Sequence, residues 1–305
     1  MSLRERLPQL AGEVFITDGG METTLIFENG LELPHFASFV LLDDQQGLEA
    51  LRNYYASYLT LAHEQGVGII LDTPTWRANP DWGNRLGYSA ADLEDVNRRG
   101  VALLEELRLE TDGDPPLVIS GCLGPRGDGY LVEAVMTPDQ AERYHSPQIR
   151  TFAATSADLV TALTLTYADE AIGVVRAARN AGIPAVISFT VETDGRLPDG
   201  QSLGEAIEAV DEATGESAAY FMLNCAHPTT SKACWKAPGW NAYAGSGPTH
   251  RRRVTPSSTR RPSSTRVIRP SSQPSTPPCD LASRTSPSWA AAVAPTSGTS
   301  GKSAP

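Results

Sequence analysis

Hydrophobic residues in the first 228 positions alternate between short continuous runs and longer segments with helical spacing. The short runs predict strands buried on both faces, which are typical of a parallel sheet. We expect six of them, at residues 13–17, 67–71, 116–120, 157–164, 185–191 and 218–223. Helical spacing or cap residues predict helices between them, at 47–65, 89–109, from 137 onward, 168–180 and 203–213. Strand and helix therefore alternate six times, which predicts an α/β fold with a parallel sheet.

Helix-start signals strengthen two of these predictions. Ser89 is followed three residues later by Asp92, which is the spacing of a reciprocal N-terminal cap. Thr137 precedes Pro138, and proline is favoured in the first turn of a helix. Six units in 228 residues project to eight in roughly 300, the length of a (β/α)8 barrel. No G-x-G-x-x-G follows the first strand, which argues against a dinucleotide-binding fold.

Polar residues follow several of the predicted strands. Asp18 and Gly19 come after the first, Thr73 after the second and Cys225 after the sixth. Parallel sheets place their chemistry at the carboxyl ends of the strands, so Cys225 is a candidate for a site, whereas Asp18-Gly-Gly could be an ordinary turn and Thr73-Pro74 could simply end a strand. A thiolate at Cys225 could hold a soft metal, but a free cysteine is also commonly a small buried hydrophobe. The residues alone leave both interpretations of Cys225 open.

The net charge of −11 conceals two unlike segments. Residues 229–305 contain 11 of the 25 Lys and Arg residues but only one of the 36 acidic ones, Asp280, and so carry a net charge of +10. Residues 1–228 therefore carry −21. The helical and strand patterns also stop near residue 229, where Pro, Ser, Thr and Arg become dense. We therefore expect a domain at 1–228 and a low-complexity, disordered basic tail at 229–305.

The cellular setting is predicted from what the sequence lacks. No apolar run approaches 18 residues, so no membrane span is expected. The amino terminus lacks the apolar segment of a signal peptide. Four cysteines without framework spacing, Cys122, Cys225, Cys234 and Cys279, favour a reducing compartment. We expect a cytoplasmic protein. His35, His63 and His145 show no pairing in the sequence and are expected to be surface or internally satisfied residues.

Taken in order, the strand ends resemble the homocysteine S-methyltransferase family. The resemblance covers about residues 12–228 and is carried by Thr17-Asp-Gly-Gly20 with Glu22 and Thr23, Leu71-Asp-Thr-Pro-Thr-Trp-Arg-Ala78, Gly124-Pro-Arg-Gly-Asp128, Ser188-Phe-Thr-Val-Glu-Thr-Asp-Gly195 and Leu223-Asn-Cys225. It implies a (β/α)8 barrel of which this chain shows the first six units. It also implies an enzyme that transfers a methyl group from a small donor to the thiolate of homocysteine, giving methionine. The donor stays open among betaine, S-methylmethionine and S-adenosylmethionine.

The resemblance also implies a zinc ion held by three thiolates, with Cys225 as one of them. The other two would form a Gly-Gly-Cys-Cys motif, and this chain has no Cys-Cys pair. By the same resemblance, Asp18 and Gly19 would hold the amino-acid end of homocysteine, and Thr73 would contact the substrate. The family's Glu at the end of the fourth strand aligns with Leu163. We expect Glu192, after the fifth strand, to substitute for it.

The tail is compatible with the missing motif in another reading frame. Trp-Ala-Ala-Ala-Val-Ala-Pro295 can encode Gly-Gly-Gly-Cys-Cys-Ala when each codon starts one base early. Residues 240–251 can likewise encode Leu-Glu-Arg-Ile-Arg-Gly-Leu-Arg-Ala-Asn-Ala-Ser, which contains a stretch common in the family. We therefore hypothesise a frameshift between about Pro228 and Trp235. Two other functions stay open. One is a binding protein whose basic tail contacts anionic partners, although nucleic acid is not favoured; the other is a metal-independent barrel enzyme.

The frameshift hypothesis predicts an inserted or deleted base in the codons between Pro228 and Trp235. Sequencing the gene and its transcript across this region checks it. A sequencing error gives a fresh read that continues in the family's frame, whereas a real frameshift gives the present sequence in both templates. An intact frame with no such base relative to related genes would contradict both forms.

Overall fold

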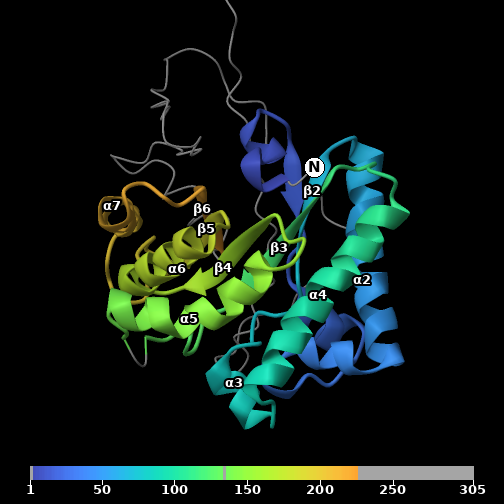
Figure 1. The fold of residues 1–305 in the computed structure, drawn as a ribbon, viewed down its shortest axis with the longest axis horizontal. Helices are drawn as coiled ribbons and strands as arrows, with labels where there is room; N and C mark the ends of the chain where they lie inside the picture. The colour runs from blue at the N-terminus through green and yellow to red at the C-terminus, as the bar shows by residue number, and fades with distance from the viewer. Residues whose placement is uncertain (1–2, 133–134, 226–305) are drawn as a thin grey trace, which may run out of the picture.

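The computed structural model describes residues 3–132 and 135–225, and these residues form an α/β fold around a six-stranded parallel sheet (Figure 1). The strand order is sequential from β1 to β6. The strands are β1 Phe15–Thr17, β2 Gly68–Asp72, β3 Leu117–Leu123, β4 Leu159–Leu165, β5 Ala185–Thr190 and β6 Tyr220–Asn224. The arrangement is that of an incomplete (β/α)8 barrel, as the sequence predicted, with all six expected strands present. The predicted tail at 229–305 lies outside the described residues.

Helices pack on one face of this sheet, and their order follows the chain (Figure 1). The long helices are α2 Gln45–Gln65, α4 Ala90–Glu110, α5 Pro138–Ala153, α6 Ala168–Ala181 and α7 Leu203–Thr214. Seven short helical elements in the described part of the chain lie before β1, between β1 and α2, or after β2. They are η1 Leu3–Glu5, η2 Pro8–Leu10, α1 Met21–Thr23, η3 Thr24–Glu28, η4 Pro34–Phe36, η5 Ser38–Asp43 and α3 Pro80–Arg85. Within the described residues, no helix is long and apolar enough to cross a membrane.

The predicted helix starts are confirmed. The Ser89 hydroxyl accepts a hydrogen bond from the Asp92 amide, and the Asp92 carboxylate accepts one from the Ser89 amide. Thr137 and Gln140 form the same reciprocal cap at α5. Each cap satisfies amides that have no partner within the helix. The short helix α3 was not expected, because its apolar content is too low to give a periodic pattern.

Alternate residues of each strand separate the interior into two layers. Odd-numbered residues of β2 and β3, such as Ile69 and Ile119, pack against the helices. The opposite face begins with a second apolar cluster to which every strand contributes one residue: Phe15, Ile70, Val118, Leu159, Val186 and Tyr220. Leu7, which precedes η2, also belongs to it. This apolar plug closes the amino-terminal end of the sheet, so a pocket can form only towards the carboxyl ends of the strands.

Arg4 fastens the amino-terminal segment to the end of α5. Its guanidinium donates to the carbonyls of Ala157 at 2.6 Å, Ala153 at 2.9 Å and Thr155 at 2.6 Å. The last carbonyls of a helix have no partner in the helix, and a cation there also complements the helix dipole. Arg4 thereby holds η1 and η2 against the apolar plug.

Replacing Arg4 by methionine should lower the free energy of unfolding by about 1–3 kcal/mol, because several helix-end carbonyls would lose a charged donor. Urea denaturation followed by circular dichroism measures the change. Arg6→Met is the matched control, since Arg6 is exposed, and it should stay within about 0.5 kcal/mol of the parent. Equal losses for both variants would contradict this role of Arg4.

Candidate active site

A pocket of about 370 Å³ lies at the carboxyl ends of the strands. Residues on or just after β1, β2, β3, β4 and β6 line it: Thr17, Asp18, Gly19, Gly20, Met21, Glu22, Thr23, Phe27, Phe36, Asp72, Thr73, Trp76, Arg77, Cys122, Asp128, Tyr130, Leu163, Thr164, Met222, Asn224 and Cys225. Four of the five residues predicted for the site, Asp18, Gly19, Thr73 and Cys225, belong to this lining. The fifth, Glu192, does not.

Asn224 fixes the end of β6 to the two preceding strands. Its side-chain oxygen accepts from the Thr164 amide at 3.0 Å and from the Ser188 hydroxyl at 2.8 Å. Its side-chain nitrogen donates to the Thr164 hydroxyl at 2.9 Å and to the Cys225 sulfur at 3.3 Å. One amide therefore ties β4, β5 and β6 together next to the thiol. The Asn-Cys pair is a structural unit as well as a possible chemical one.

Cys225 is half-buried at the pocket wall, with its backbone in the left-handed region at φ 54°. That conformation is uncommon for a residue other than glycine and indicates that the surrounding contacts hold the turn. The Tyr130 hydroxyl donates to the Cys225 sulfur at 3.4 Å. Cys225 is thus a thiol with two polar donors beside it, rather than a packed apolar group.

Asp18 is deeply buried and already has partners for both carboxylate oxygens. Oδ1 accepts from the Asp72 amide at 2.9 Å, and Oδ2 accepts from the Tyr54 hydroxyl at 3.1 Å. Burial, together with the nearby Asp72 carboxylate, raises the pKa of Asp18 well above its ordinary value. The Gly19 carbonyl accepts from the hydroxyls of Tyr54 and Tyr58. This network connects β1, β2 and α2 beneath the pocket.

The Thr73 hydroxyl is also hydrogen-bonded within the protein. Its Oγ1 shares a 2.6 Å hydrogen bond with the Thr75 hydroxyl and accepts from the Cys122 amide at 2.9 Å. The side chain is buried, and Cys122 beside it is also buried. Burial raises the pKa of the Cys122 thiol well above its ordinary value, so this thiol is a poor nucleophile. Thr73 orients the wall of the pocket, where it also remains a candidate substrate contact.

Asp72 is a lining residue that the sequence predictions missed. Burial raises its pKa to about 7, opposed by a hydrogen bond from Ser120 and reinforced by the charge of Glu22. Its Oδ1 is enclosed without a hydrogen-bond partner among the described residues. The sequence did carry a signal, because an acid at the end of an otherwise apolar strand is costly to bury and is therefore unusual.

The end of β4 departs from a regular strand. The pairing of β4 with β5 shifts between Ala162 and Leu165, and Thr164 has φ 63°. Leu163 lines the pocket at the position where the resemblance expected an acid. Glu192 does not compensate, because it is exposed in the turn after β5 and is not among the lining residues. The acids that do line the pocket come from or follow β1, β2 and β3: Asp18, Glu22, Asp72 and Asp128.

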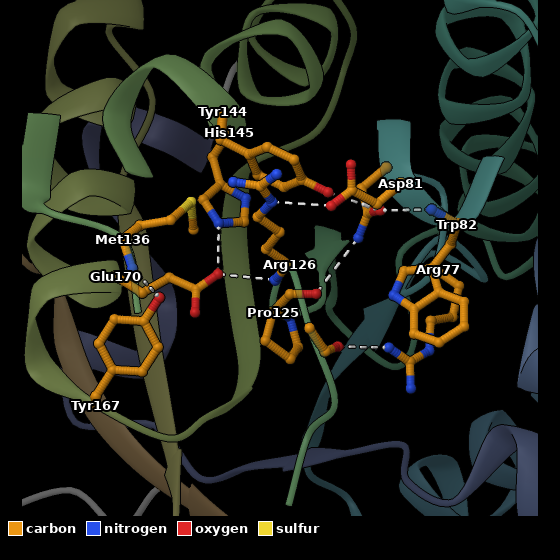
Figure 2. Close-up of polar contacts among 12 residues, drawn as sticks. Arg77, Asp81, Trp82, Pro125, Arg126, Met136, Tyr144, His145, Tyr167 and Glu170 are labelled. Carbon is orange, nitrogen blue, oxygen red and sulfur yellow. Dashed lines mark hydrogen bonds and ion pairs between the residues drawn. The ribbon is translucent and has the colours of Figure 1, made fainter. Parts of the chain in front are cut away.

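The loop from Gly124 to Tyr130 is clamped from behind by a polar network (Figure 2). Figure 2 shows Glu170 between His145 and Arg126: its Oε1 lies 2.9 Å from His145 Nε2 and accepts from the Arg126 amide at 2.8 Å. Arg126 in turn pairs with Asp81 at 2.8 Å. The pairing of His145 was not visible in the sequence, because its partner is 25 residues away on the next helix. This network holds the loop that presents Tyr130 to Cys225.

The donor set tests whether the described residues fit the zinc ion that the resemblance implies. Cys225 supplies one thiolate, whereas a zinc site needs three or more protein ligands. Within residues 3–132 and 135–225, no group of three His, Cys, Asp or Glu side chains could hold a metal ion. The described residues alone therefore do not fit a zinc site. Any further zinc ligands would have to come from other residues of the chain.

The fold and site define an α/β barrel-type protein with its pocket at the carboxyl ends of parallel strands. The sequence profile of the homocysteine S-methyltransferase family matches residues 15–262, so the chain belongs to this family, as the strand-end resemblance predicted. The match extends past residue 228, where we predicted the domain to end. Membership makes the chain an enzyme by relationship, with homocysteine as the family's methyl acceptor.

Solved structures of one enzyme, the Escherichia coli homocysteine methyltransferase MmuM, share the fold. The metallated form has a TM-score of 0.61 at 19% identity, covering 77% of this chain and 81% of MmuM. For the oxidized form the TM-score is 0.58 at 18% identity, covering 73% of this chain and 76% of MmuM. The apo form gives 0.55 at 19% identity, covering 77% and 80%. A search of curated protein sequences gave no match.

The Asp72 carboxyl should make stability depend on pH. Its pKa of about 7 exceeds the ordinary value of 3.8, so the folded state binds more protons and loses stability as pH rises between these values. Asp72→Asn should therefore stabilise the fold by about 2–4 kcal/mol at pH 8 and have little effect near pH 4. Urea unfolding at both pH values measures this. Exposed Glu64→Gln should change neither value, and an equal gain at pH 4 and pH 8 would contradict the assignment.

Proposed function

We propose that this protein transfers a methyl group from a small onium or folate donor to the sulfur of homocysteine, producing methionine. The observation that carries the proposal is the Cys225 thiol at the end of β6, held by Asn224 in a pocket of about 370 Å³. Family membership supports homocysteine as the acceptor. Zinc dependence is a part of the proposal that follows from the resemblance, a cytoplasmic location is a part that follows from the sequence composition, and the particular donor stays open.

The reaction forms one bond and breaks one bond at the same carbon. The homocysteine sulfur attacks the methyl carbon of the donor, the bond from that methyl to the donor heteroatom breaks, and the thiol proton is released. The two reactants must lie in line, and holding them so replaces a costly bimolecular encounter. The pocket supplies this constraint through strand ends that are tied to one another by Asn224 and by Asp18.

The roles of the named residues follow from the family resemblance. Cys225 would provide one thiolate of a zinc site, and zinc, when bound, would supply the affinity for a thiolate sulfur. Asp18 and Gly19 are proposed to hold the amino-acid end of homocysteine, and Thr73 is proposed to contact the substrate. Glu192, proposed from the sequence as a replacement for the missing acid on β4, would need to move to reach the pocket, since it is exposed after β5.

Zinc content tests the completeness of the site. The 305-residue chain should hold well below one zinc per molecule after dialysis, because the described residues offer one thiolate. A variant with the frame restored, which regains Gly-Gly-Gly-Cys-Cys-Ala, should hold about one zinc. Atomic absorption measures both. Near-stoichiometric zinc in the 305-residue chain would contradict this account.

Methionine formation tests the proposed reaction. Homocysteine is incubated with betaine, S-methylmethionine or S-adenosylmethionine, and methionine is quantified by mass spectrometry. The frame-restored variant should be active with one of these donors, and Cys225→Ser should lower its rate by at least about 100-fold, because a hydroxyl cannot replace a soft ligand. Glu64→Gln, an exposed substitution on α2 away from the pocket lining, is the control in the same frame-restored background and should not change the rate. An active Cys225→Ser variant would contradict the role of this thiol.

A further inference from the structure

Arg77 is a buried cation that forms no ion pair with a carboxylate of the described residues, although the charges of Asp128 and Glu22 act on it. It follows β2, and only 6% of its surface is exposed. Its guanidinium carbon lies 4.0 Å from the centre of the Trp76 ring and 3.9 Å from that of Trp82. Figure 2 shows one nitrogen of Arg77 donating to a backbone oxygen, which is the Gly127 carbonyl at 2.9 Å. Buried arginines are nearly always paired with a carboxylate or phosphate, so this one is unusual.

The donors of Arg77 are incompletely used. Nε is enclosed and has no hydrogen-bond partner. Among the described residues no carboxylate lies within ion-pair distance of the guanidinium, and Asp128 and Glu22 favour its charged form only through their own charge. Stacking on two indoles holds the planar group in one orientation. Burial lowers the pKa of Arg77 to about 10, which leaves it charged at neutral pH. A fixed, charged fork that lines a pocket is suited to a planar anion.

The rest of the pocket defines which anion can enter. Arg77 is the only arginine or lysine among the described lining residues, while Asp18, Glu22, Asp72 and Asp128 contribute four carboxyl groups. A phosphate dianion would meet repulsion from these acids. A carboxylate attached to a cationic centre would meet Arg77 with one end and the acids with the other. Both homocysteine and a donor such as betaine have this zwitterionic chemistry.

We propose that Arg77 binds the carboxylate of a zwitterionic ligand in this pocket, with the cationic centre of the same ligand directed to Asp72 and Glu22. The assignment rests on the proposed function only for the names of the ligands. It gives this chain a carboxylate site on the loop after β2, separate from Cys225 on β6. It also explains how the pocket selects a charged amino acid or betaine although β4 presents Leu163 instead of an acid.

Ligand pairs that differ in the carboxylate provide the test. Calorimetric titration of the 305-residue chain compares homocysteine with 3-aminopropane-1-thiol, and betaine with choline. The parent should bind one zwitterion about 10–100-fold more tightly than its carboxylate-free partner, the range expected for a charged hydrogen bond. A preference within the first pair identifies the acceptor as the ligand of Arg77, and a preference within the second identifies the methyl donor.

Variants of Arg77 locate the effect. Arg77→Gln should remove the preference while binding of the carboxylate-free compound changes less than about threefold, and Arg77→Lys should restore part of it. Arg85→Gln is the matched control, because Arg85 also contacts the Trp82 ring, at 4.4 Å, but does not line the pocket. Thermal unfolding identifies variants that fail to fold. If a variant does fail, the comparison of the two ligands of each pair on the parent protein still tests the proposal.

The outcomes separate this proposal from the proposed function. No preference in either ligand pair, or a preference that survives in folded Arg77→Gln, overturns the carboxylate site. A preference that depends on Arg77 in a frame-restored variant that makes no methionine upholds the site and contradicts the proposed reaction. Methionine formation that is unaffected by Arg77→Gln, in KM for both substrates, overturns the site and leaves the reaction standing.

Discussion

The site depends on one side-chain amide. Asn224 accepts from β4 and β5 and donates to both Thr164 and Cys225, so the ends of three parallel strands share a single group. An amide has both donors and an acceptor and can satisfy all of these partners at once. A carboxylate at this position could not donate to the Cys225 sulfur, which explains why asparagine suits it.

Sequence reasoning predicted the strands and long helices because their causes are local. Apolar runs specify buried strands, and Ser89 and Thr137 specify helix starts. It also placed Asp18, Thr73 and Cys225 at one pocket, because carboxyl ends of parallel strands converge. What it could not show depends on contacts between distant residues. His145 finds Glu170 only when α5 packs on α6, and the exposure of Glu192 depends on the shape of the turn after β5.

The inner face of the sheet shows why continuous apolar runs predicted the strands but not the polar residues at their ends. Its lower layer is apolar, with one residue from each strand, whereas its upper part contains Asp72, Ser120, Thr161 and Ser188. These polar residues are nearly all buried and most have a polar partner: the Ser120 and Thr161 hydroxyls lie 2.7 Å apart, and the Ser188 hydroxyl donates to Asn224. Each bond satisfies a group that would otherwise be costly to bury. The change from apolar to polar residues marks where packing ends and chemistry can begin.

The charged residues of the pocket restrict which ligands can bind, whichever methyl donor is used. Asp18 and Asp72 are held close together at raised pKa, so the empty pocket retains protons that a cationic ligand would displace. Arg77 carries the opposite charge, and two indole rings position its guanidinium where an ion-paired acid would be usual. Both arrangements cost stability, and the proposed zwitterionic ligand would relieve both. Residues that leave such costs unrelieved are more informative about function than the residues that form the core, because packing alone gives no reason to keep them.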